Sequence, residues 1–285
     1  MGYFIYLVTL IAIYMMVIIS YAVPVGWTGL LTLGHISLLA VGAYTAAILM
    51  THGVSFWFGL LAAALAAGGV SFLLALPARR IKEDYFTLIT IGFIFVVNAI
   101  IVNWTSVTKG PFGITGIERP SGFEDPFSFM ALTVLALLIT AFFLQRVVNS
   151  PFGRALESVR DDDLVAESLG KPVAKLRIVS LVTSGVFVGG AGAFVAAFLQ
   201  FINAQVFWLD NVIFILAAIV VGGLASFRGA IVGTLVLYLI FEPLRFLPFP
   251  PGLIGSLRLG TFSLLLLLVV IFRPKGIMGR AQLGE

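Results

Sequence analysis

The chain has 285 residues, of which 60% are hydrophobic and 11% charged, with a formal net charge of +4. Soluble domains average about 25% charged residues, so this composition excludes a soluble enzyme, a nucleic-acid-binding domain and a disordered protein. The chain has no cysteine, which excludes disulfides, thiolate metal sites and thiol nucleophiles. We therefore predict an all-α integral membrane protein, built as a polytopic helical bundle.

Three spans are predicted before the first charged side chain, Arg79. The first 78 residues contain no Lys, Arg, Asp or Glu, and a helix needs about 20 apolar residues to cross a bilayer core. Glycine and proline clusters divide this stretch into spans at 4–23, 27–50 and 56–76. The first segment lacks the basic start of a signal peptide, so we expect a retained helix. The second is either a complete span or a re-entrant segment.

Charged residues divide the remainder of the chain. Two polar stretches stand out, a loop rich in glycine and proline at 105–126 and the most charged stretch of the chain at 145–177. Further spans are predicted around and between them, at 85–104, 127–144, 178–200, 211–225, 229–247 and 254–272. The sequence therefore predicts about nine spans, within a range of eight to ten.

The basic residues predict the orientation, because Lys and Arg accumulate in the cytoplasmic loops of membrane proteins. With 77–84, 145–177, Arg228 and the tail after Phe272 inside, 13 of the 17 basic residues lie inside and 4 outside. We therefore predict the N-terminus outside and the C-terminus inside. The loop at 105–126 is then external.

Polar residues within the predicted spans are almost all neutral. None of the 13 acidic residues falls in the middle of a span, which argues against an ion-coupled carrier. His35 is the one ionisable side chain predicted deep in a span, either as a packed histidine or as a proton relay. The residues that either line a solute pathway or tie helices together are Gly34, His35, Ser37, Gly42, Tyr44, Thr45 and Asn98.

Two segments resemble each other internally. Residues 42–47 read GAYTAA and residues 192–197 read GAFVAA. A repeated half of a transporter is one explanation. We favour the other, that small residues recur wherever membrane helices approach closely.

The chain lacks the motifs of an ATPase or a hydrolase. Its one Gly-Lys pair, Gly170-Lys171, is followed by Pro172 instead of Ser or Thr, and the preceding glycine of a phosphate-binding loop is missing. A serine elbow and a His-Glu-x-x-His motif are also absent from the sequence. We expect this chain to be no enzyme and to have no catalytic residue, metal or cofactor.

Residues 149–177 predict two short amphipathic helices. Ser150 before Pro151 is typical of an N-cap, the aspartates at 161–163 suit the start of a second helix, and Gly170 with Pro172 is a stop signal. The segment is either a solvated loop or a docking element. Charges of both signs around a small apolar ridge (Leu164, Val165, Ala166 and Leu169) fit a protein groove better than anionic lipid.

Four stretches carry a family resemblance. Residues 151–170, PFGRALESVRDDDLVAESLG, resemble the cytoplasmic coupling segment of branched-chain amino acid ABC permeases of the LivH/LivM type. Residues 33–44, 221–229 and 272–276 resemble the family's N-terminal glycine-rich helix, its later glycine-rich turn and its C-terminal signature. The last of these is more similar to LivM than to LivH.

The resemblance implies a single permease domain over residues 1–285 in a prokaryotic cytoplasmic (inner) membrane. Such permeases work with a sister permease, two cytoplasmic ATPase subunits and a periplasmic or lipid-tethered binding protein, which the loop at 105–126 is expected to receive. The coupling segment, 145–177, would contact an ATPase subunit. The positions that the resemblance assigns to this contact are Phe152, Gly153, Arg154, Ala155, Arg160, Ala166, Glu167 and Gly170.

The resemblance favours an importer of branched-chain or related amino acids. A permease for urea or short amides in the same family stays open, because the neutral candidate pathway residues fit many small solutes. A channel or secondary carrier that needs no ATPase is the alternative from a different class.

Overall fold

The computed structural model describes residues 2–79, 81, 83–242, 260–261, 263–264, 267–269, 271–273 and 276–279. Six helical stretches in this part of the chain are long and apolar enough to cross a membrane. They are α1 (Gly2–Ala22) with its continuation to Trp27, α3 (Phe56–Ala75), α4 (Glu83–Asn103), α6 (Pro126–Val148), α9 (Val173–Leu199), and a short turn at Ala204–Phe207 followed by α10 (Leu209–Gly222). Two shorter apolar helices, α2 (His35–Thr51) and α11 (Phe227–Phe241), lie among them.

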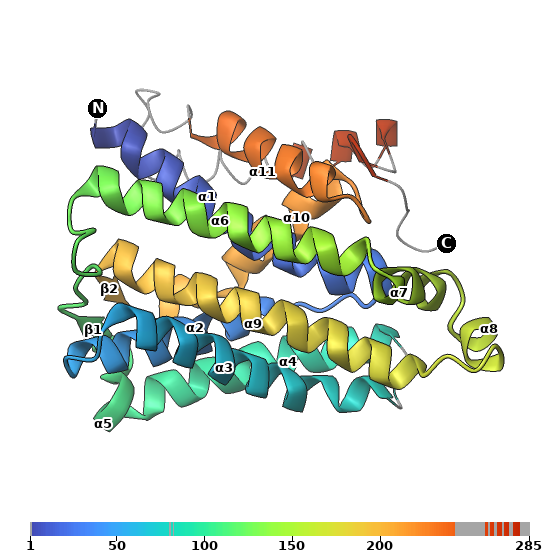
Figure 1. Cartoon of the computed structure of the whole chain (residues 1–285), viewed down its shortest axis with the longest axis horizontal. Helices are drawn as coiled ribbons and strands as arrows, with labels where there is room; N and C mark the ends of the chain where they lie inside the picture. Colours follow the sequence, from blue (N-terminus) through green and yellow to red (C-terminus); the bar gives the residue numbers. More distant parts are fainter. Residues whose placement is uncertain are drawn as a thin grey trace.

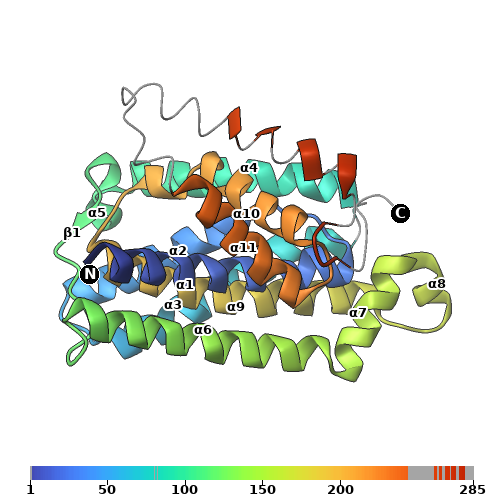
Figure 2. The ribbon, with the colours of Figure 1, turned by 90° about the horizontal axis from the view of Figure 1, so that it is seen from above.

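The helices lie side by side along the long axis of the molecule, and the smaller elements gather at its two ends (Figures 1 and 2). One end carries the N-terminus, α5 (Thr105–Thr108), and β1 (Ile114–Thr115) paired antiparallel with β2 (Phe201–Ile202). The other end carries α7 (Pro151–Asp161) and α8 (Asp163–Ser168). We call α7 and α8 the arm. The loop at 105–126 and the arm therefore lie at opposite ends of the bundle.

Helix α9 is the centre of the bundle and makes its most extensive contacts with α2 and α3. Glycines bring these helices together: a Cβ at Gly42 would overlap the backbone of Gly189, and a Cβ at Gly192 would lie 2.6 Å from the backbone nitrogen of Ala43. In lipid, where helices gain little from hydrophobic burial, such close van der Waals contact drives association. The similar segments 42–47 and 192–197 meet at this crossing, which supports the packing explanation of their similarity.

The predicted helical class is confirmed, and the predicted spans 56–76, 85–104 and 127–144 agree with α3, α4 and α6 to within a few residues. Helices α9, α10 and α11 occupy the next three predicted positions. The second part of the span predicted at 229–247 and most of the span predicted at 254–272 lie outside the described residues.

The first two predicted spans were wrong in their boundary. The first was expected to end at Pro24, but a π-helical turn, Val23–Trp27, carries the helix past it. The second was expected to begin at Trp27, yet its helix begins only at His35. The reason is local. The carbonyl of Pro24 accepts hydrogen bonds from the hydroxyl of Thr28 (2.5 Å) and the amide of Leu30 (3.2 Å), which closes the helix and turns the chain.

Two adjacent glycines of α9 test the packing at its crossing with α3. A Cβ at Gly189 would overlap Ala67 and the carbonyl of Ala63, whereas a Cβ at Gly190 would meet only the end of Leu60 at 3.6 Å. We expect Gly189→Ala to destabilise the protein by about 1–3 kcal/mol through overpacking. Gly190→Ala should be neutral or stabilising, because alanine favours a helix by about 1 kcal/mol. Thermal unfolding of both variants in detergent measures the difference, and equal midpoints would contradict this account.

Candidate functional site

A stretch of non-helical backbone, Gly29 to Gly34, lies between the end of the first helix and the start of α2 inside the bundle; we call it the break. At 1.5 Å per residue, the 17 residues of α2 extend about 25 Å, less than the bilayer core of about 30 Å. Helix α2 is therefore too short to cross the core by itself. Non-helical backbone within a membrane is tolerated only where protein or a water-filled cavity satisfies its polar groups.

Helix α4 satisfies two of those backbone groups. The hydroxyl of Thr87 donates to the carbonyl of Leu31 at 2.8 Å, and the hydroxyl of Thr90 accepts from the amide of Leu33 at 3.0 Å. Thr90 also donates to the carbonyl of Thr87 at 2.7 Å, so its hydrogen is already engaged and its lone pair is free to accept. The side chains of α4 thus replace the hydrogen bonds that a continuous helix would have supplied.

His35 begins α2 at the inner end of the break and is only 2% exposed. Its Nε2 lies 2.5 Å from the hydroxyl of Ser184 on α9, and that hydroxyl lies 2.6 Å from the carbonyl of Ser20 on α1. Because the Ser184 hydroxyl gives its one hydrogen to Ser20, it must accept from Nε2–H of His35. This assignment, made from the network, leaves Nδ1 of His35 as an acceptor.

Several buried polar atoms near His35 have no hydrogen-bond partner among the described residues. They are Nδ1 of His35 itself, the hydroxyl of Tyr21, whose ring centroid is 4.5 Å from that of His35, and the hydroxyl of Thr32 in the break. Buried polar groups are paired in the great majority of cases. These three groups are therefore able to hydrogen-bond water or a polar solute that enters the bundle here.

The other predicted pathway residues divide into two groups. Gly34 caps α2 beside Thr90, and Ser37 is buried one turn later. The remaining four make helix contacts: Gly42 meets Gly189, Tyr44 lies near Phe207, Thr45 donates to the carbonyl of Val41, and Asn98 donates to the carbonyl of Ala204. Only the start of α2 is thus brought to the break. The sequence prediction did not include Tyr21, Thr87 or Thr90, although the i, i+3 hydroxyls of α4 were a visible signal.

The arm is capped as its sequence predicts. The hydroxyl of Ser150 accepts from the amide of Phe152 at 3.2 Å, with Pro151 at the first helical position. The carboxylate of Asp162 accepts from the amide of Val165 at 2.9 Å and begins α8. Gly170 then adopts φ +77°, a left-handed conformation that glycine favours, and the chain turns towards α9.

The eight predicted contact residues of the arm lie in different environments. Gly153 and Ala166 are buried, and a Cβ at Gly153 would overlap the carbonyl of Val148. Phe152 and Ala155 are half-buried against the hydrophobic core. Arg160 turns towards the bundle, where it donates to the carbonyl of Gly26 at 3.1 Å. The three that are exposed to solvent are Arg154, Glu167 and Gly170.

The apolar ridge of α8 is exposed to solvent. Leu164 is 74% exposed and Leu169 is 71% exposed, with Val165 between them also exposed. Ala166, the fourth residue of the predicted ridge, is buried. The arm therefore presents three apolar side chains beyond the end of the helical bundle.

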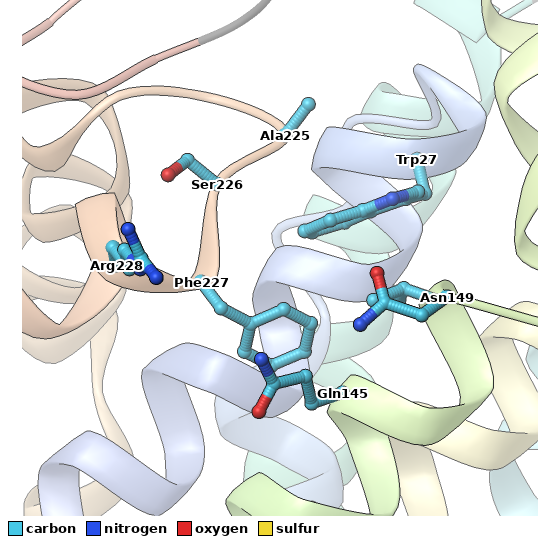
Figure 3. Close-up of a pocket in the computed structure, with 8 residues that line it drawn as sticks. Trp27, Gln145, Asn149, Ala225, Ser226, Phe227 and Arg228 are labelled. Carbon is cyan, nitrogen blue, oxygen red and sulfur yellow. The ribbon is translucent and has the colours of Figure 1, made fainter.

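A pocket of about 250 Å³ lies at the base of the arm, between the ends of α1 and α6 and the turn from α10 to α11 (Figure 3). Its lining residues are Trp27, Gln145, Val148, Asn149, Ala225, Ser226, Phe227 and Arg228. Two of the stretches that resemble family signatures meet near it, because a Cβ at Gly276 would lie 2.5 Å from Cα of Gly223, and the amide of the following residue, Ile277, donates to the carbonyl of Val221 at 3.0 Å. These stretches thus have a structural role at the end of the bundle that carries the arm.

Known proteins resemble the chain over nearly its whole length. A family model described as branched-chain amino acid transport system / permease component matches residues 3–272. The chain is 32% identical to the high-affinity branched-chain amino acid transport system permease protein LivM of Escherichia coli (strain K12), over 96% of this chain and 70% of that protein. It is 25% identical to the corresponding LivH protein of the same strain, over 98% and 95%. No solved structure gives a significant match.

The hydrogen bond from the break to Thr90 can be tested by two substitutions. Thr90→Val keeps the shape of the buried side chain but leaves the amide of Leu33 without its acceptor, which costs about 1–3 kcal/mol. Thr90→Ser keeps the hydroxyl and should retain more of the stability. We expect a lower thermal midpoint in detergent for Thr90→Val than for Thr90→Ser. The reverse order would show that the methyl group matters and the hydrogen bond does not.

Proposed function

The chain belongs to the family of branched-chain amino acid transport permease components, and on that premise we propose that it imports branched-chain or related amino acids as the membrane-spanning subunit of an ATP-driven ABC transporter. The observation that carries the proposal is the family match over residues 3–272. Members of this family are transport subunits, so ATP hydrolysis belongs to separate subunits of the system.

The partners follow from the same premise. Similarity to both LivM and LivH proteins implies a permease pair, here this chain and a sister permease. Two ATPase subunits would bind on the cytoplasmic side and a periplasmic or lipid-tethered binding protein on the other, with residues 1–285 as one permease domain in a prokaryotic inner membrane. The distribution of basic residues supports a cytoplasmic arm, and the position of loop 105–126 at the opposite end fits docking of the binding protein (Figure 2).

The ATPase contact is best supported at the ridge of α8. Exposed apolar side chains that project beyond a membrane bundle favour a protein partner, and Leu164, Val165 and Leu169 have this character. Arg154 and Glu167 are exposed on the same arm and would form polar contacts around the ridge. Gly153 and Ala166 would then act by holding the arm in shape, whereas Arg160 would connect the arm with the carbonyl of Gly26.

The translocation route is best supported at the break. Polar backbone held by side chains, together with buried hydroxyl and imidazole groups that have no partner within the described part of the chain, supplies hydrogen-bonding groups for a small zwitterion. In this proposal Tyr21, Thr32 and His35 border the route. Gly42, Thr45 and Asn98 contribute by packing and by tying helices together.

Uptake in reconstituted vesicles tests the proposed function. The chain is purified with its sister permease, the two ATPases and the binding protein, and radiolabelled leucine and urea are compared as substrates. ATP-dependent uptake of leucine is the expected result. Uptake of urea alone would assign the chain to a different substrate class, and uptake that proceeds without ATP would reject the importer in favour of a channel or carrier.

A pair of charge substitutions tests the two docking ends. Phe112, at the loop end, is 87% exposed, and Leu164 is exposed in the first turn of α8, where an acidic residue suits the helix. We expect Leu164→Glu to weaken ATPase capture in pull-downs at least tenfold and leave binding-protein capture unchanged. Phe112→Glu should do the opposite. Loss of both partners in either variant would indicate misfolding, and retention of both in Leu164→Glu would exclude the ridge as the contact.

Removal of one buried hydroxyl tests the route. Tyr21→Phe deletes a hydroxyl that makes no hydrogen bond to any residue that the structure describes, so the thermal midpoint should not fall. If Tyr21 borders the route, the KM of the assembled transporter for its amino acid should change by about tenfold, equivalent to about 1.4 kcal/mol. Tyr85→Phe, at an exposed tyrosine of α4, is the matched control. Identical KM values in Tyr21→Phe and wild type would remove Tyr21 from the route.

A further inference from the structure

One buried arginine joins three helices at the end of the bundle that carries the arm. Arg177, in the second turn of α9, is only 7% exposed. Its Nη2 lies 2.5 Å from a carboxylate oxygen of Glu83, the first residue of α4, and 3.2 Å from a carboxylate oxygen of Asp163, the first residue of α8. Charge-assisted hydrogen bonds of this kind are among the strongest in proteins. Arg177 therefore connects α8 with the beginning of α4.

A second arginine connects the arm with the break directly. Arg160, near the end of α7, donates from Nη1 to the carbonyl of Gly26 at 3.1 Å, just before the break. Its Cγ lies 3.4 Å from the position that a Cβ would occupy at Gly29, and Oε2 of Glu83 lies 3.7 Å from the same point. Gly29 has φ +72°, which marks the sharp turn into the break. The arm and α4 thus both approach the break at Gly29.

Helix α4 continues this contact along the break. Glu83, Thr87 and Thr90 are spaced i, i+4 and i+7, so they share one face of the helix. Thr87 and Thr90 on that face hold the carbonyl of Leu31 and the amide of Leu33. A movement of Glu83 that carries α4 with it would therefore change the positions of both hydrogen bonds to the break.

We propose that Arg177 and Arg160 are positioning residues that transmit a displacement of the arm to the break. The conformation of α7 and α8 then determines the geometry of the hydrogen bonds that the break makes. The inference rests on the proposed function, because an ATPase is what would displace the arm. Beyond that function, it identifies the break as the element that responds to the movement of the arm, and Arg177 and Arg160 as the side chains that connect the two.

The two ion pairs of Arg177 are not equivalent. The contact with Asp163 is the longer one and joins the arm, whereas the shorter contact joins Glu83 within the bundle. Both carboxylates are partly exposed to solvent, so water screens both ion pairs and each can rearrange. A displacement of the arm that moves Asp163 therefore shifts Arg177, and the shorter contact passes this shift to Glu83.

The decisive experiment distinguishes a loss of coupling between the arm and the break from a failure to assemble with the ATPase. Arg177→Gln, Arg160→Gln and the milder Asp163→Asn are compared with Lys175→Gln, an exposed cation on the same turn of α9 that makes no ion pair in the described residues. The assembled transporter is assayed for ATPase capture, ATP hydrolysis and uptake. We expect each of the first three variants to capture ATPase as wild type does but to take up at least fivefold less substrate per ATP. Lys175→Gln should match wild type.

A purely structural role would give a different result. Hydrolysis and uptake would then fall together with the amount of assembled complex, leaving uptake per ATP unchanged, and that outcome in Asp163→Asn would overturn the proposal. Hydrogen exchange provides a readout on the chain alone. We expect the amides of Leu30 and Leu33 in the break to exchange at least fivefold faster in Arg177→Gln than in Lys175→Gln, and equal rates would also overturn it.

The same measurements distinguish this inference from the proposed function. If the wild-type chain fails to capture any ATPase, the proposed function is wrong, whatever the exchange rates are. If wild type captures ATPase and imports substrate but the exchange rates in the break do not respond to Arg177→Gln, the transport assignment stands and the transmission route is wrong.

Discussion

The bilayer forbids unpaired backbone polar groups, and the arrangement of this chain around residues 29–34 follows from that constraint. The helix from the N-terminus stops at Trp27, and α2 begins only at His35. The backbone between them needs donors and acceptors from elsewhere. Thr87 and Thr90 of α4, the carbonyl of Pro24 and the guanidinium of Arg160 supply contacts in and beside it. The positions of α4 and α7 relative to α1 are therefore fixed by hydrogen-bonding requirements as much as by packing.

Close packing of α2 against α9 stabilises the fold although the backbone before α2 is non-helical. Where Gly189 and Gly192 face Gly42 and Ala43, the backbones approach without intervening side chains, and this contact anchors the middle of α2. A helix that begins inside the bundle is thereby held at its midpoint. Ser184 lies on the same helix α9 and reaches both His35 and Ser20. The central helix thus organises the apolar crossing and the polar contact at the start of α2 together.

Sequence and structure agree where the signal is local. Windows of about 20 apolar residues identified α3, α4 and α6, and capping residues identified both ends of the arm, Ser150 and Gly170. The break was not identified, because it carries no charged residue and three leucines, and hydropathy does not report backbone conformation. The inward direction of Arg160 and the burial of Arg177 depend on contacts with Gly26, Glu83 and Asp163, which are distant in sequence. Tertiary contacts of this kind have no periodic signature.

The arm has two faces with different chemistry, and this division permits it to serve two neighbours at once. Its outward face is an apolar ridge at Leu164, Val165 and Leu169, whereas its inward face carries the charged contacts of Arg160 and Asp163. Apolar contact is non-directional and tolerates small changes of angle, so a partner can grip the ridge while the arm tilts. Hydrogen bonds and ion pairs are directional, so the same tilt changes the inward contacts first. A coupling element needs one face that binds its partner and another whose contacts with the bundle change when the partner moves it. The arm has both kinds of face.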